Sequence, residues 1–220
     1  MTHLIRKEIM LQKKILWFGF AYSIFLFMVF SNPIFRDFVY IMTAFGISYI
    51  AIIGAIQTEY KNNSDIVLNS LPISRREIVL SKYLTIFVFA GIALLIVAII
   101  GLFFHLAPLP FEHRLININD ILITLISVLL LSAVSLPAYF KTGAQWLRVI
   151  NIIVFMLIFF APAQIARYVL ENQHQPGLQK LIDLAQQNPW LLAVSSLVTL
   201  LVLLLLSYLL AVRIYSRRDF

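Results

Sequence analysis

Long apolar segments alternate with short polar ones along this chain of 220 residues. Six apolar windows stand out, at about residues 15–31, 38–57, 83–104, 121–139, 149–166 and 189–212. Each approaches the length of about 20 residues that an α-helix needs to cross the hydrocarbon of a bilayer. The pattern therefore predicts an all-α polytopic membrane protein, with six transmembrane helices in a single domain over residues 1–220.

The positive charges between the windows are distributed unevenly. Six spans place both termini on one side, together with residues 58–82 and 140–148. Thirteen of the 17 Lys and Arg residues lie on that side: Arg6, Lys7, Lys13, Lys14, Lys61, Arg75, Arg76, Lys82, Lys141, Arg148, Arg213, Arg217 and Arg218. The opposite side has Arg36, Arg114, Arg167 and Lys180. Since an excess of Lys and Arg marks cytoplasmic loops, both termini are expected in the cytoplasm. Orientation, rather than nucleic-acid binding, then explains the net charge of +7.

Composition excludes or disfavours several classes of site. No cysteine is present, so the chain has no disulfide, thiol nucleophile or cysteine-based zinc site. The four histidines lack H-E-x-x-H spacing, and no G-x-x-x-x-G-K-[ST] motif is available to hold a nucleotide. No charged or histidine side chain falls inside the six windows, which argues against an ion-coupled carrier. We therefore expect no catalytic set, metal site or cofactor in this chain.

The window at 149–166 contains the main strongly polar residues within the apolar segments, Asn151 and Gln164. They are expected to form hydrogen bonds between helices. Pro162 should kink or break the helix of this window near its outer end.

The polar insert between the second and third windows reads NNSDIVLNSLPISRREIVLSKY, at residues 62–83. Its first ten residues divide on a helical wheel into two faces, one with Ser64, Val67, Leu68 and Leu71 and one with Asn62, Asp65 and Asn69. Ile66 lies beside the polar face, where an exposed apolar side chain suits insertion into a partner. Pro72 ends this short helix.

A second helix is expected to start directly after that proline. Ser74 and Glu77 have the spacing of a capping box, in which each side chain bonds the backbone amide of the other residue. The helix then continues into the third window. The insert is thus predicted to be a structured cytoplasmic elbow that docks a partner; the alternative is a plain connecting loop.

The N-terminal segment, residues 1–14, has the pattern of a basic amphipathic helix. One side carries Arg6, Lys7, Met10, Lys13 and Lys14, and the other carries Leu4, Ile5, Ile9, Leu11 and Ile15, with Glu8 and Gln12 among them. Such a helix is expected to lie along the inner leaflet, with its cations at anionic lipid headgroups. The alternative is a merely solvated basic start.

Two segments resemble a known family. The first is EYKNNSDIVLNSLPISRREIVLSKY at residues 59–83, and the second is LPAYFKTGAQWLRVIN at residues 136–151. Together with the basic N-terminus they resemble the ABC-2 type transporter permeases, above all the small bacterial permeases that include the phenol-soluble modulin exporter. The resemblance covers nearly the whole chain.

The resemblance implies roles for specific residues. A coupling helix at Asn62–Leu71 would dock on a separate ATP-binding subunit, and the N-terminal segment would be a connecting helix that also lies against that subunit. A short outer helix would lie within residues 167–188, where Leu178, Leu181, Ile182 and Ala185 form an apolar stripe. The candidate coupling residues are Glu59, Asn62, Asn63, Ser64, Asp65, Ile66, Val67, Leu68, Asn69, Leu71, Pro72, Arg75, Arg76 and Glu77. Those of the connecting helix are Arg6, Lys7, Met10, Lys13 and Lys14. Those of the second cytoplasmic loop are Pro137, Phe140, Lys141, Gly143 and Arg148.

The resemblance also implies a function. The chain would be the membrane subunit of an ATP-driven exporter in the bacterial cytoplasmic membrane, carrying amphipathic or hydrophobic peptides such as toxins. Two copies would form a homodimer with two ATPase subunits, which bind the ATP and Mg²⁺, so the chain itself is not an enzyme. The alternatives are export of drugs, lantibiotics or ions for self-protection, and a non-transporting membrane scaffold.

Overall fold

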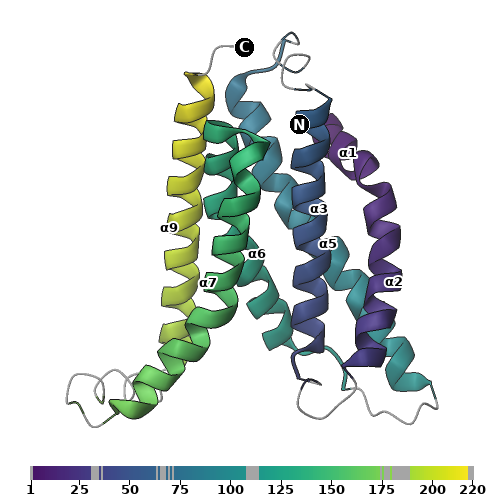
Figure 1. The fold of residues 1–220 in the computed structure, drawn as a ribbon, viewed down its shortest axis with the longest axis vertical. Coiled ribbons are helices and arrows are strands. Elements are labelled where there is room, and N and C mark those ends of the chain that lie inside the picture. Colours follow the sequence, from purple (N-terminus) through teal and green to yellow (C-terminus); the bar gives the residue numbers. More distant parts are fainter. Residues whose placement is uncertain are drawn as a thin grey trace.

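The computed structural model describes residues 2–30, 35, 37–62, 64, 68, 70, 72–107, 114–173, 175, 179 and 189–217. This part of the chain folds into long helices and confirms the predicted all-α class (Figure 1). The helices are α1 (Thr2–Leu11), α2 (Lys13–Val29), α3 (Val39–Lys61), α5 (Arg75–Leu106), α6 (Ile118–Thr142), α7 (Ala144–Glu171) and α9 (Pro189–Ser216).

The six predicted apolar windows correspond in order to α2, α3, α5, α6, α7 and α9. Not all of these helices have the length and composition of a membrane span. Among the described residues, four segments do: α3, α5, α6 and Val194–Ser216 of α9. A fifth is added if α1 and α2, which meet at an angle of 54°, count as one bent span. In α7 the apolar stretch among these residues is the shorter Val149–Ile158. The chain is therefore a multi-pass membrane protein.

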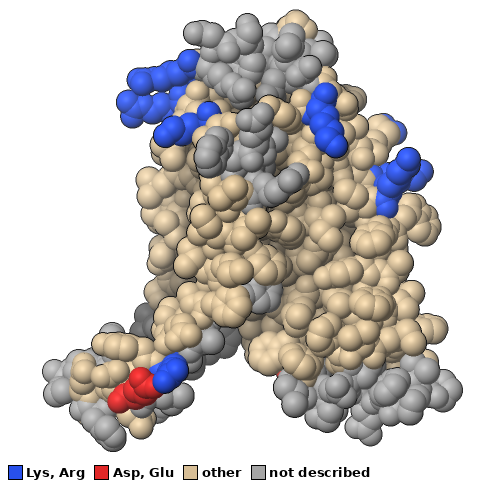
Figure 2. All heavy atoms as spheres, in the orientation of Figure 1, with Lys and Arg blue, Asp and Glu red and all other residues tan. Residues whose placement is uncertain are grey.

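The two ends of the helix bundle differ in charge. α1 and α5 begin at the upper end in Figure 1, where α3 and α9 end. Exposed cations surround this end, some of them visible in Figure 2. They are Arg6, Lys13, Lys14, Lys61, Arg76, Lys141, Arg213 and Arg217. We call this the basic end of the molecule.

Two clusters of buried apolar side chains hold the helices together. The larger one lies nearer the basic end and draws on α3, α5, α6 and α9. Small side chains at Ala51, Ala55 and Ala90 are buried in it and let α3 and α5 approach closely. The second cluster joins α2, α3 and α5 nearer the opposite end, with Phe27 packed edge-on against Tyr40 at a centroid distance of 5.1 Å.

The connection between α6 and α7 is much shorter than predicted. The expected loop at 140–148 is wrong, because α6 runs to Thr142 and α7 starts at Ala144, so that Gly143 alone joins them. Gly143 has φ 73° and ψ −169°, a backbone conformation open essentially to glycine. One such residue suffices to reverse the chain, and both helices therefore continue to the turn.

α7 shows the predicted bend and one of the two predicted polar contacts of its window. It stays helical through position 162 but bends in the half that is farther from the basic end, as Figure 1 shows. The predicted bond between helices is confirmed for Asn151, whose side-chain oxygen accepts a hydrogen bond from the Ser135 hydroxyl of α6. Gln164 is exposed.

A polar network centred on Arg114 fastens the end opposite the basic end. The Arg114 guanidinium forms two hydrogen bonds to the Asp120 carboxylate, at 2.6 and 2.8 Å, and one to the backbone carbonyl of Asp37 at 2.7 Å. The Tyr40 hydroxyl donates in turn to the Arg114 carbonyl at 2.6 Å. The hydrogen bonds with Asp120 raise the pKa of Arg114 above its ordinary value, so this residue stays cationic. The network ties α3 to the start of α6.

Candidate functional site

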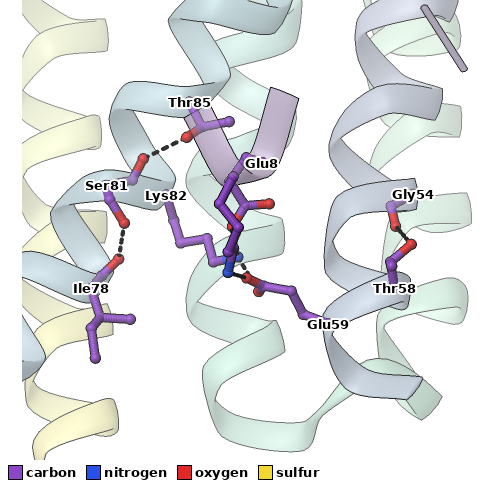
Figure 3. Close-up of polar contacts among 9 residues, drawn as sticks. Glu8, Gly54, Thr58, Glu59, Ile78, Ser81, Lys82 and Thr85 are labelled. Carbon is purple, nitrogen blue, oxygen red and sulfur yellow. Dashed lines mark hydrogen bonds and ion pairs between the residues drawn. The ribbon is translucent and has the colours of Figure 1, made fainter. Parts of the chain in front are cut away.

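Four charged side chains from three helices meet inside the basic end. Lys82 of α5 reaches between Glu8 of α1 and Glu59 of α3, as Figure 3 shows. Its ammonium lies 2.7 Å from Glu8 Oε1 and also contacts Glu59 Oε2. Lys7 closes the group at 2.6 Å from Glu59 Oε1. We call these four residues the ion cluster.

The ion cluster is shielded from solvent on all but one side. The side chains of Glu8, Glu59 and Lys82 are 3%, 0% and 7% exposed, whereas that of Lys7 is 33% exposed. Two carboxylates and two ammonium groups balance in charge, which is a requirement for keeping ions out of water. Removing one partner from such a group leaves an uncompensated buried charge, so the arrangement holds α1, α3 and α5 in one relative position.

The surroundings of Glu8 also contain polar atoms without partners among the described residues. They are Glu8 Oε2 and both side-chain polar atoms of Gln12, which is 1% exposed. The Gln12 carboxamide lies against Gly54 of α3, where an added Cβ would come within 2.7 Å of Gln12 Oε1. A cavity of about 20 Å³ borders Glu8, Lys82 and Thr85, which is room for one water molecule.

The ion cluster changes the interpretation of α1. Leu4 and Ile9 of α1, together with Ile15 of α2, pack against the chain's own buried core. Glu8 and Gln12 lie on this same inward side, and Lys7 turns toward it. This side of α1 therefore meets protein, while the expected contact of the outward cations with lipid headgroups stays a prediction. Arg6 and Met10 are exposed on the outward side of α1, and Lys13 and Lys14 are exposed at the start of α2.

The start of α5 has the predicted cap. The Ser74 hydroxyl accepts a hydrogen bond from the Glu77 amide, and the Glu77 carboxylate accepts one from the Ser74 amide at 3.0 Å. The helix begins at Arg75, as the capping box predicted. The Arg75 guanidinium donates to the last carbonyls of α9, those of Tyr215 at 3.2 Å and Ser216 at 2.9 Å. Arg76 and Pro72 are exposed.

Several of the predicted coupling residues can be placed between α3 and this cap. Leu68 is 5% exposed and belongs to the larger core cluster, so it anchors the insert to the helix bundle. Asn62 is exposed, and Ser64 is half-buried. The remaining predicted positions of this segment, Asn63, Asp65, Ile66, Val67, Asn69 and Leu71, lie outside the described residues, as does the apolar stripe expected at 178–185.

The residues of the predicted second loop lie in helices and at the turn between them. Pro137 and Phe140 are buried in α6, and Lys141 is exposed in its last turn. Gly143 lies against the ring of Tyr60 from the end of α3, which would come within 3.3 Å of an added Cβ. The side chain of Arg148 lies outside the described part. The turn thus brings the ends of α3, α6 and α7 together.

Comparison with known proteins decides the family. A family model described as ABC-2 family transporter protein matches residues 3–216. The chain belongs to this ABC-2 transporter family. Comparisons with curated proteins and with solved structures give no match. The resemblance predicted from the sequence is confirmed, and the chain is a membrane component of an ABC transporter, in which ATP is hydrolysed by a separate subunit.

The sequence-based prediction of the site missed three residues of this ABC-2 permease. Lys82 was counted among the cytoplasmic cations, and neither Glu8 nor Gln12 was assigned a role. A signal was present, since Glu8 and Gln12 are four residues apart on the otherwise apolar side of α1. Polar residues at this spacing share one helix face, and they indicate that the face meets protein rather than lipid.

Proposed function

We propose that this ABC-2 permease exports amphipathic or hydrophobic peptides across the bacterial cytoplasmic membrane, driven by two copies of a separate ATPase subunit. The basic end faces the cytoplasm, the chain crosses the membrane six times, and two copies form the permease. The charge asymmetry between the two ends supports this orientation, because Lys and Arg accumulate on the cytoplasmic side.

The ion cluster is the observation that carries the proposal. It joins α1 to the end of α3 and the start of α5, the segments that flank the insert at residues 62–74. When ATP closes the two ATPase subunits, they displace the docked insert. A unit whose helices are fastened by buried ions transmits this displacement to the membrane segments as a nearly rigid body.

The outward side of the basic end supplies the contacts with the ATPase. Arg6 and Met10 on α1, Lys13 at the start of α2 and Arg76 on α5 are exposed, so they are available to a partner. Cargo of amphipathic or hydrophobic character agrees with the membrane segments, which carry few buried charges away from the two ends. A path without charged residues offers nothing to replace the hydration of a charged cargo group, so it suits the apolar side of such a peptide.

The experiment is co-purification of a tagged chain from its native membranes in mild detergent, followed by ATP-dependent uptake of a fluorescent amphipathic peptide into inverted vesicles. We expect an ATPase to co-purify with the native chain and to be lost with Arg76→Glu. Arg167→Glu, an exposed substitution at the opposite end, is the matched control and should retain the ATPase.

Two results would contradict the proposal. If no ATPase co-purifies with the native chain, the protein is better explained as a membrane scaffold. If an ATPase drives the uptake of drugs or ions but not of peptide, the proposed peptide cargo is wrong. Leu68→Asp is a poor substitute for Arg76→Glu, because Leu68 is buried in the chain's own core and its loss affects folding.

A further inference from the structure

The inner end of α9 is fastened to the elbow that contains the Ser74 cap. The last carbonyls of a helix have no partner within the helix. Here the Arg75 guanidinium supplies one, at 3.2 Å from the Tyr215 carbonyl and 2.9 Å from that of Ser216. The Tyr215 ring is fully buried and packs edge-on against Phe140 of α6, with a centroid distance of 5.1 Å. A movement of the elbow therefore reaches α9 directly.

α9 has a second attachment near its middle. The Ser207 hydroxyl donates to the Ala133 carbonyl of α6 at 2.6 Å and lies 2.6 Å from the Tyr83 hydroxyl of α5. Because Ser207 has a single hydroxyl proton, Tyr83 must be the donor in that second bond. Both partners belong to other helices, so α9 is held at this point on two sides.

Beyond this attachment, α9 lines an open hollow of about 550 Å³ that it shares with α6. Three hydroxyl residues of α9, Ser195, Ser196 and Thr199, face the hollow together with Ile126 and Leu130 of α6. Its size is within the usual range of ligand sites. None of the described residues that line it is charged, so this lining suits an uncharged or amphipathic group. From Ser196 to Ser216 the helix measures about 30 Å at 1.5 Å per residue.

We infer that α9 is a lever: Arg75 moves its inner end, Ser207 is the pivot, and the hollow at Ser195–Leu203 is the part that opens or closes. The inference rests on the proposed function, because the ATPase supplies the movement. Arg75 is then a positioning residue that acts within the chain, although the sequence had suggested a contact with the ATPase.

The chain contains no cysteine, which makes a single introduced thiol a clean reporter. Ser196→Cys places it in the hollow with little change in size. The rate of its reaction with a small maleimide is measured in the complex with the co-purified ATPase, without nucleotide and with ATP plus vanadate. We expect the rate to change several-fold on trapping the nucleotide, and this change to be lost in Arg75→Gln while the ATPase remains bound.

Two control variants separate a lever from a merely structural role. Arg213→Gln removes an exposed cation from the same end of α9 and should preserve the ATP-dependent change. Arg75→Lys should preserve part of it, because an ammonium group also bonds the last carbonyls of a helix. Thermal unfolding of all three variants checks that they fold.

The outcomes are distinguishable. The lever is wrong if the reaction rate of the thiol changes with ATP in Arg75→Gln as much as in Arg213→Gln. It is also wrong if Ser196→Cys with Arg75 intact shows no ATP-dependent change in this rate while the ATPase is bound. If no ATPase co-purifies even with Ser196→Cys alone, the proposed function fails, and the lever with it.

Discussion

Lys82 is the residue on which the ion cluster depends most. It is 7% exposed and contacts both buried carboxylates, whereas the side chain of Lys7 is 33% exposed to solvent. A lysine in such a position is tolerable only because its two partners offset the loss of hydration. The reverse also holds, since Glu8 and Glu59 need the lysine.

Lys82→Met is therefore expected to lower the free energy of unfolding by about 3–5 kcal/mol, the usual cost of breaking a buried ion pair. Lys7→Met, the control, should cost about 1 kcal/mol or less, because solvent reaches this side chain. Thermal unfolding of the purified chain in detergent measures both. Adding Glu8→Gln and Glu59→Gln to Lys82→Met should recover most of the loss. An equal loss in the two single variants would contradict the assignment.

Single residues were predictable from the sequence where their partners are close in the chain. Ser74 and Glu77 are three residues apart, and their reciprocal bonds follow from helix geometry alone. Glu8, Glu59 and Lys82 come from three separate helices. No spacing rule places such residues together, so only the packing of α1, α3 and α5 reveals the ion cluster.

At the scale of elements, the apolar windows predicted the helices but not their ends. α3 continues four residues beyond its window to Lys61, and α5 starts eight residues before its window at Arg75, where the capping box rather than the window had predicted the start. A window ends where charged residues begin, whereas a helix continues if those charges find partners. Glu59 and Lys82 are such residues, since they pair with each other.

The turn between α6 and α7 is an element whose shape rests on one residue. Gly143 combines φ 73° with ψ −169°, which costs a residue with a side chain about 1–3 kcal/mol. Gly143→Ala is expected to lower the free energy of unfolding by about this amount, measured by thermal unfolding. Tyr60→Ala added to it should not restore stability, because the strain is in the backbone rather than in the contact with the ring.

Gly91→Ala is the matched control for this prediction. Gly91 is inside α5, and an added Cβ would meet nothing within 4 Å. Alanine favours a helix interior over glycine by up to about 1 kcal/mol, so the control should be neutral or stabilising. If Gly143→Ala behaved like Gly91→Ala, the turn would not require its unusual backbone conformation.

At the scale of the whole molecule, two polar networks fasten opposite ends of a mainly apolar bundle. The ion cluster joins α1, α3 and α5 at the basic end, and Arg114 joins α3 to the start of α6 at the other. α3 is thus held at both ends. The larger exposed apolar surfaces lie on α7 and α9, for example at Ile153, Met156, Leu201 and Leu205.

The family was predictable at this scale, because the resemblance rests on residues that are near one another in the sequence. The asymmetry of charge was predictable too, because it requires only a count of Lys and Arg along the chain. The number of membrane crossings was less so. α1 and α2 form a bent pair and α7 has only a short apolar stretch among the described residues, so hydropathy alone does not decide which helices cross.

The central claim is that the ion cluster makes α1 and the start of α5 one rigid unit. The measurement that tests it most directly is the distance between spin labels at Leu11→Cys and Leu80→Cys, two exposed positions on α1 and α5 of a chain without cysteine. It is made on the complex with its ATPase, with and without ATP. We expect one narrow distance distribution, which ATP leaves unchanged and Lys82→Met broadens. A distance that shifts on adding ATP, or a distribution that stays narrow in Lys82→Met, would contradict this claim.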